Sequence, residues 1–203
     1  MGKLALAAKI THVPSMYLSE LDGPQHGSRQ AAIDGQIPSL SLLMCENNPV
    51  YTLGKSADKS HLLVNPDFLK QIGAQSYQIE RGGDITYHGP GQLVVYPLLD
   101  LNLYNMGAKA YIYTLEQVII DVLTEYKITG ERIESKTGIW IDKGKQNERK
   151  IAAIGIKCSR HLTMHGLAFN VNTNLDYFNH IVPCGLADSQ VTSLEKELGR
   201  HIA

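Results

Sequence analysis

The stretch 149–171, RKIAAIGIKCSRHLTMHGLAFNV, decides the fold class of this chain. Two apolar runs, 150–158 and 162–171, lie on either side of the polar pair Ser159-Arg160. Apolar runs of this length, bounded by polar residues, are typical of buried strands. The stretch therefore predicts two consecutive strands with a hairpin-like turn between them.

The rest of the chain predicts further short strands and a few helices. Apolar runs predict strands at 40–45, 76–80, 93–99 and 138–142, and the polar stretch 143–148 is typical of a hairpin loop. Apolar residues at three- and four-residue steps predict a helix over 108–126. Shorter helices are expected at 67–72, 176–178 and 191–198, and a broken or late-starting helix within 15–36. Adjacent strands without regular βαβ alternation indicate an α+β class in a single domain, 1–203.

Bulk composition excludes several classes of protein. The chain has 203 residues, 43% of them hydrophobic, and a formal net charge of −1. A balanced charge argues against a nucleic-acid binder, although a local basic rim remains compatible with an acidic protein partner. The three widely spaced cysteines form neither a disulfide framework nor a zinc-ligand pattern. Without a signal-peptide pattern or an apolar run of membrane-spanning length, the expected location is the cytoplasm, with no membrane association.

The densest glycine region is RGGDITYHGPGQ, 81–92. Glycine permits close approach of a backbone to a ligand, and N–H groups exposed in such loops bind anionic or carbonyl oxygens. The stretch matches neither a dinucleotide nor a phosphate-loop fingerprint. A pair of turns with surface polar residues is the alternative interpretation.

Cys184 and Lys150 are candidates for nucleophilic chemistry. Cys184 lies between Pro183 and Gly185, in the sequence IVPCG, and a thiol becomes a strong nucleophile once a nearby base or cation favours the thiolate. Lys150 opens an apolar strand, where burial would lower its pKa and allow proton exchange near neutral pH. The alternatives are a small buried hydrophobe and an exposed strand-end lysine. Cys45 and Cys158 lie in apolar strand patterns and are expected to be buried and inert.

Small and apolar residues flank these candidates. Ala152, Ala153 and Gly155 leave space beside their strand, as the wall of a tunnel would require. The stretch HGLAFN, 165–170, has a similar character. His165 is a possible proton carrier, but a structural histidine is the more common case. The eight histidines show no metal-ligand spacing, so no metal site is expected.

Several of these motifs, in order, resemble the LipB-type octanoyltransferase (lipoyl(octanoyl) transferase) family. The resemblance rests on RGGDITYHGPGQ, RKIAAIGIKCSRHLTMHGLAFNV, IVPCGL and VTSLEKELGR, together with PVYTLGK at 49–55. It covers about residues 40–200. It implies a fold like the catalytic module of biotin and lipoate protein ligases, a central mixed and largely antiparallel sheet flanked by helices.

The resemblance also implies an activity: octanoyl transfer from acyl carrier protein to a lysine of a lipoyl domain, the first step of endogenous protein lipoylation. It implies Cys184 as the nucleophile and Lys150 as its acid/base partner, with no metal, cofactor or ATP. The expected partners are octanoyl-acyl carrier protein and the lipoyl domains of 2-oxoacid dehydrogenases and the glycine cleavage H protein. A monomer is expected. The implied substrate-binding residues are Arg81, Gly82, Gly83, Asp84, Ile85, Thr86, Tyr87, His88, Ala153, Ile154, Gly155, Gly166, Leu167 and Ala168.

The sequence departs from the family pattern at three places. Family members often carry a histidine before PVYTLG, where this chain has Glu46-Asn47-Asn48. The early helical stretch is unusually rich in glycine and proline, and relatives often continue beyond Arg200. If the missing histidine assists catalysis, more of that task falls to His88 or Lys150. Two alternatives stay open: an ATP-dependent lipoate or biotin protein ligase, and a non-catalytic module that binds an acyl group or carrier protein.

Overall fold

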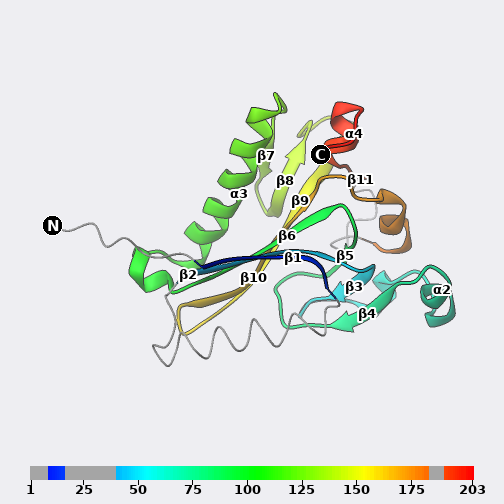
Figure 1. Ribbon diagram of the computed structural model, residues 1–203, viewed down its shortest axis with the longest axis horizontal. Helices are drawn as coiled ribbons and strands as arrows, with labels where there is room; N and C mark the ends of the chain where they lie inside the picture. Colours follow the sequence, from blue (N-terminus) through cyan, green and yellow to red (C-terminus); the bar gives the residue numbers. More distant parts are fainter. Residues whose placement is uncertain (1–8, 17–39, 183–189) are drawn as a thin grey trace.

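The computed structural model describes residues 9–16, 40–182 and 190–203 (Figure 1). Within these residues the elements, in chain order, are β1 (Lys9–Met16), β2 (Leu40–Asn47), β3 (Val50–Leu53), η1 (Lys59–His61), α2 (Pro66–Gln71), β4 (Gln75–Gln78), β5 (Ile85–His88), β6 (Gln92–Leu99), η2 (Leu101–Tyr104), α3 (Ala108–Glu125), β7 (Glu131–Ile133), β8 (Lys136–Ile141), β9 (Arg149–Ser159), β10 (Leu162–Asn170), η3 (Leu175–His180), β11 (Gln190–Val191) and α4 (Leu194–Leu198).

A large mixed sheet forms the centre of the molecule. Its strand order is β1-β2-β6-β10-β9-β8-β7, and β11 pairs with β9. The pairs β1–β2 and β11–β9 are parallel, whereas the other neighbours along this path are antiparallel. This arrangement confirms the expected α+β class with a largely antiparallel sheet.

The hairpin of β9 and β10 lies in the middle of the sheet, as the stretch 149–171 predicts. Its register pairs Gly166 with Gly155 and Ala168 with Ala153. The two turn residues, Arg160 and His161, both have positive φ, at 51° and 65°. Positive φ at both central residues is the geometry of two-residue hairpins whose twist matches that of the flanking strands.

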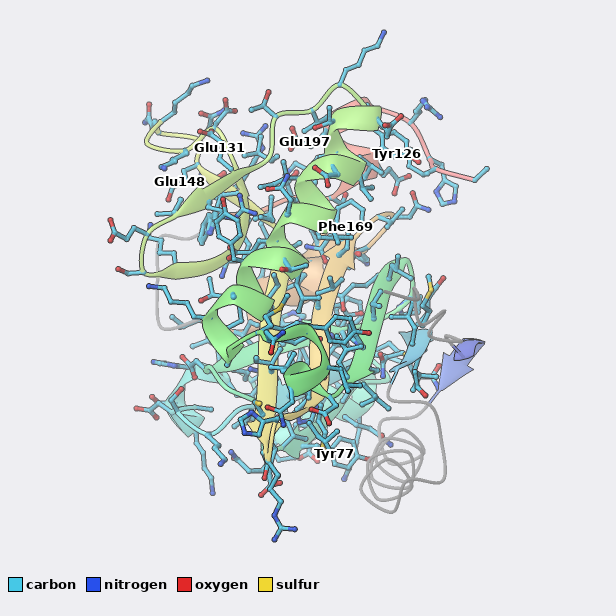
Figure 2. All side chains as sticks on the ribbon, turned by 90° about the vertical axis from the view of Figure 1, so that its left-hand side faces the viewer. Tyr77, Tyr126, Glu131, Glu148, Phe169 and Glu197 are labelled. Carbon is cyan, nitrogen blue, oxygen red and sulfur yellow. The ribbon has the colours of Figure 1, made fainter. Side chains whose placement is uncertain are left out.

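Two layers cover opposite faces of the large sheet. Successive residues of a strand point to opposite faces, and β10 follows this rule. Leu167 and Phe169 pack in a core cluster with α3, which crosses in front of the sheet in Figure 2. Ala168 packs instead with Val50 of the small sheet, which has the order β4-β3-β5. The small sheet therefore packs on the large sheet through contacts such as that of Val50 with Ala168.

The main helix matches its predicted range. α3 spans Ala108–Glu125, against an expected 108–126. Tyr111, Leu115, Ile119 and Leu123 are buried at four-residue steps, which is the apolar stripe of an amphipathic helix. Over the described parts of the chain, no helix combines the length and apolarity needed to cross a bilayer.

Two local expectations are wrong, and a third falls almost entirely outside the described residues. Of the broken or late-starting helix expected within 15–36, only Ser15 and Met16 are described, at the end of strand β1, and residues 17–36 lie outside the described residues. The helix expected at 191–198 begins only at Leu194, because Ser193 caps it and Val191 pairs in β11. Cys158 is exposed, near the end of β9, whereas Cys45 is buried as expected.

Candidate active site

A cavity of about 410 Å³ lies between the glycine-rich loop 81–84 and the strands β9 and β10. This volume is in the range of small-molecule sites, about 300–1,000 Å³. The cavity is lined by Ile79, Arg81, Gly82, Gly83, Asp84, Ile85, Thr86, His88, Val94, Tyr96, Ile112, Ser135, Lys136, Thr137, Lys150, Ala153, Ile154, Gly155, Ile156, His165, Gly166, Leu167 and Ala168.

The glycine-rich loop is bound to both sheets through its backbone. Gly82 N donates to Ile156 O of β9 at 3.1 Å, and Lys55 N donates to Arg81 O at 3.0 Å. Gly83 has φ +90°, a conformation that side chains rarely adopt. A Cβ on Gly155 would stand 3.1 Å from Gly82 O, so the absence of a side chain there lets β9 approach the loop.

Arg81 holds the loop from the inside. Its side chain is 8% exposed, and Nη2 donates to Thr52 O at 2.7 Å and to Thr52 Oγ1 at 3.0 Å. Nε also donates to Thr52 Oγ1, at 3.2 Å, and Nη1 donates to Gly82 O at 3.0 Å. A buried guanidinium requires such hydrogen bonds to offset its desolvation. Arg81 thus ties the cavity wall to β3.

His88 is a neutral group in the same wall. Its Nδ1 lies 2.8 Å from Gln92 Oε1, and its Nε2 lies 3.4 Å from Thr52 Oγ1. Burial lowers the pKa of His88 to about 4, and the positive charge of Arg81 acts in the same direction. The imidazole is therefore uncharged near neutral pH.

Lys150 lies at another side of the cavity, against an aromatic ring. Its Nζ is 4.6 Å from the ring centroid of Trp140, and Lys136 Nζ is 5.1 Å from the same centroid. The ring is fully buried and fixed, since Trp140 Nε1 donates to Lys136 O at 3.0 Å. Lys136 also pairs with Glu148 at 2.9 Å. The face of an aromatic ring attracts cations, so Trp140 holds two ammonium groups beside the cavity.

The chain that follows residue 189 is docked onto β9 beside Lys150. Val191 pairs with Lys150 in the parallel register of β11, and Thr192 N donates to Lys150 O at 2.9 Å. Arg149 forms a two-pronged ion pair with Glu197, at 2.7 and 2.6 Å. Glu197 is labelled near α4 in Figure 2. The pair fixes α4 and β11 to the start of β9.

The chain that precedes residue 183 is fixed near Asp84 of the glycine-rich loop, through His61. Val182 N donates to His61 O at 2.9 Å. His61 Nδ1 in turn lies 2.5 Å from Asp84 Oδ2, a residue that lines the cavity. Cys184, the candidate nucleophile, lies outside the described residues.

His165 lines the cavity from an unusual backbone position. It is 7% exposed and lies within β10, opposite Ile156, with φ +59°. Non-glycine residues rarely adopt positive φ, and such positions concentrate at functional sites. Its proximity also contributes to the lowered pKa of His88.

The cavity brings together most of the residues that the sequence singles out. Thirteen of the fourteen expected substrate-binding residues line it, and Lys150 lines it with them. Tyr87 does not: its ring stacks on Tyr177 with centroids 4.7 Å apart, in the core beneath the small sheet. Sequence reasoning missed Val94 and Tyr96 as lining residues, and also the hairpin residues 135–137. The pairing of β6 with β10 would have indicated the first two.

Comparisons with known proteins place the chain in a family. The family described as "Lipoyl protein ligase A/B catalytic domain" matches residues 29–203. An octanoyltransferase of Bacteroides fragilis is 50% identical over 161 residues, which is 79% of this chain and 73% of that protein. An octanoyltransferase of Parabacteroides distasonis is 46% identical over 200 residues, 98% of this chain and 87% of that protein.

A solved structure shows the same fold. It is part of the archaeal lipoylation system of Thermoplasma acidophilum, a bipartite lipoate protein ligase, with a TM-score of 0.65 and 15% identity. The superposition covers 93% of this chain and 74% of that chain. Because the family match spans most of the sequence and the relatives are identical at about half of the aligned positions, the chain belongs to the octanoyltransferases of the lipoyl protein ligase A/B family and is an acyltransferase.

Proposed function

We propose that this acyltransferase moves an octanoyl group from octanoyl-acyl carrier protein to a specific lysine of lipoyl domains, through an acyl thioester on Cys184. The acceptors would be the lipoyl domains of 2-oxoacid dehydrogenases and the glycine cleavage H protein. Residues 1–203 act as one catalytic domain and as a monomer. The reaction is the first step of endogenous protein lipoylation.

The observation that carries this proposal is the composition of the cavity. Its walls combine apolar side chains, small residues on two paired strands and a glycine-rich loop, with Lys150 among the lining residues. Val94, Ala168 and Ala153 lie side by side across three strands, which leaves a smooth apolar surface for an alkyl chain. Burial of such a chain stabilises binding by about 0.8 kcal/mol per methylene.

Each step of the transfer then has a group to move its proton. Lys150 accepts the proton of the Cys184 thiol, and the thiolate attacks the carbonyl carbon of the donor thioester. The carbon–sulfur bond to the carrier breaks, and the leaving thiolate takes the proton from Lys150. The ε-amine of the acceptor lysine then attacks the Cys184 thioester and forms an amide. Lys150 receives the amine proton and returns a proton to the Cys184 sulfur.

The anchoring of the flanking chain supports this role for Cys184. Val182 is hydrogen-bonded beside the His61–Asp84 pair, and Val191 is paired with Lys150 itself. Val182 thus lies beside one wall of the cavity, and Val191 lies beside the candidate acid/base residue. A thioester donor already carries an activated acyl group, so the transfer requires no ATP.

A purified-component assay tests the proposal. Octanoyl-carrier protein, a lipoyl domain and the enzyme are mixed without ATP, and intact mass reports octanoylation of the domain. Wild type and a Cys158→Ser control should both transfer, whereas Cys184→Ser should not. Octanoylation that requires free octanoate and ATP would overturn the transferase in favour of a ligase, and binding without turnover would favour a non-catalytic module.

A further inference from the structure

A single chain of buried hydrogen bonds runs from the glycine-rich loop to the strand of Lys150. Five polar side chains take part, and each is at most 8% exposed: Arg81, Thr52, His88, Gln92 and Asn170. The buried backbone of Thr192 continues the chain to Lys150. Gln92, Asn170 and Thr52 do not line the cavity, whereas His88 and Arg81 do. Buried polar networks of this kind fix the orientation of their members when every donor has an acceptor.

The far end of the chain sets the orientation of both amides. Asn170 Nδ2 donates to the backbone oxygen of Thr192 at 3.0 Å, so its Oδ1 points to Gln92. Gln92 Nε2 donates to that Oδ1 at 2.9 Å and to Tyr87 O at 3.2 Å. A flipped Gln92 would turn its oxygen toward two acceptor oxygens. Gln92 Oε1 therefore has to face His88.

This orientation determines which nitrogen of His88 carries the proton. An amide oxygen only accepts hydrogen bonds, and Gln92 Oε1 lies 2.8 Å from His88 Nδ1. Nδ1 must then be the protonated nitrogen, and Nε2 of a neutral ring is an acceptor. Thr52 supplies the matching donor at 3.4 Å, because its Oγ1 already accepts from Arg81 and has its own proton to give.

We propose that Gln92 and Asn170 are positioning residues that hold His88 as the neutral, Nδ1-protonated tautomer. His88 then anchors Thr52, and through it Arg81, as a fixed part of the cavity wall, and carries no proton in the reaction. The far end of the chain reaches Lys150, because Thr192 N donates to Lys150 O. The network thus fixes the position of the glycine-rich loop relative to the strand that carries Lys150.

Protonation of His88 would break this arrangement. A proton on Nε2 would point at the Thr52 hydroxyl, which is itself the donor in this hydrogen bond. The new positive charge would also lie near Arg81 and His165, the two groups whose charges already lower the pKa of His88. Thr52 would lose its acceptor and turn away, which weakens the anchor of Arg81. Burial, which lowers the pKa of His88 to about 4, protects the neutral form.

Histidine NMR on the full chain tests the proposal without any assay of activity. With ¹⁵N-labelled histidine, and the His88 signals assigned from a His88→Asn variant, wild type should show the Nδ1–H tautomer from pH 5.5 to 8. Thr52→Val should keep that tautomer, because Gln92 sets it. Gln92→Met should give a mixture of tautomers, whereas the surface control Gln71→Met should not. The proposal is overturned if wild type shows the Nε2–H tautomer. It is also overturned if Gln92→Met keeps the Nδ1–H tautomer of wild type unchanged.

A second arm reads the consequence for catalysis and rests on the proposed octanoyl transfer. In Gln92→Glu, a carboxylate facing Nδ1–H raises the pKa of His88 toward neutrality. The rate of transfer should then fall about tenfold per pH unit on the acid side of that raised pKa. Wild type and Gln71→Glu should lack this limb. A wild-type acid limb that His88→Asn removes would make His88 a proton carrier and contradict the inference. If neither wild type nor any variant transfers the octanoyl group, the proposed function fails while the NMR result still stands.

Discussion

The two sides of the cavity use polar groups in opposite ways. On the His88 side, Arg81, Gln92 and Asn170 are buried and hydrogen-bonded to partners that fix their directions, and the His88 ring is neutral. On the other side, Lys150 and Lys136 are only partly buried, and the Lys150 ammonium group lies 4.6 Å from the ring centroid of Trp140. The first side suits the binding of an acyl chain, and the second suits the proton transfers proposed for Lys150.

The comparison assigns different consequences to substitutions on the two sides. Changes near Lys150 should slow the chemical steps and leave the fold intact. Changes near His88 should alter stability, its pH dependence and the fit of the acyl chain.

Lys150→Met should produce the largest loss. Positioned acid/base groups contribute about 10²–10⁴-fold to rate, so octanoyl transfer should fall by about that factor while the melting temperature stays near that of wild type. Lys136→Met is the matched control, because Lys136 lies against the same ring and lines the same cavity. Steady-state and single-turnover rates measure both; equal losses in the two variants would contradict a special role for Lys150.

His88→Asn should change the pH dependence of stability. The pKa of His88 is about 4 in the folded state, whereas it is near 6.5 in the unfolded chain. The unfolded state therefore binds more protons between these values, and stability is full above 6.5 and is lost as pH falls toward 4. This loss amounts to about 3 kcal/mol. Urea unfolding at several pH values should show a flatter profile in His88→Asn than in wild type or in the exposed control His201→Asn.

Arg149→Met should release β11 and α4 from β9. Arg149 pairs with both carboxylate oxygens of Glu197, and both side chains are less than a fifth exposed. Loss of charge-assisted hydrogen bonds at this exposure costs about 1–3 kcal/mol. We expect faster hydrogen exchange over residues 190–198 and slower transfer, with Arg200→Met as the control on the surface. Unchanged exchange in Arg149→Met would show that the ion pair does not hold the segment.

Ala168→Val should shift the preferred length of the acyl chain. Ala168 is 5% exposed and lies between Val94 and Ala153 on the cavity surface. The two added methyl groups shorten the space available to the acyl chain. The affinity for the acyl chain should fall by about fourfold for each methylene that no longer fits. Competition between hexanoyl- and octanoyl-carrier proteins reads the shift. Ala110→Val on the exposed side of α3 should keep the wild-type ratio.

The sequence predicts the centre of the fold better than its edges. The hairpin 149–171 and helix α3 carry strong local patterns, and both are confirmed. Strand β1 was missed because KITHVPSM contains a proline and only weak alternation, and its pairing with β2 is distant in sequence. The cap at Ser193 was available in the sequence and would have located the start of α4.

The site was predicted where glycines and small residues mark it. Residues 81–88, apart from Tyr87, line the same cavity as the small-residue stretches 153–155 and 166–168. All three stretches lie within motifs that the sequence shows. The hairpin residues 135–137 carry no such mark and reach the cavity only through the register of β8 with β9. The tautomer of His88 depends on Asn170, 82 residues away along the chain, and needs three-dimensional contacts to be inferred.

Peptide mapping of the acylated enzyme tests the central claim most directly. The enzyme is mixed with octanoyl-carrier protein alone, without ATP or acceptor, then quenched in acid and digested, and tandem mass spectrometry locates the added octanoyl group. We predict a single thioester, on the peptide that contains Cys184, which disappears on addition of a lipoyl domain. An octanoyl group on Cys45, Cys158 or a lysine, or none at all, would contradict the account.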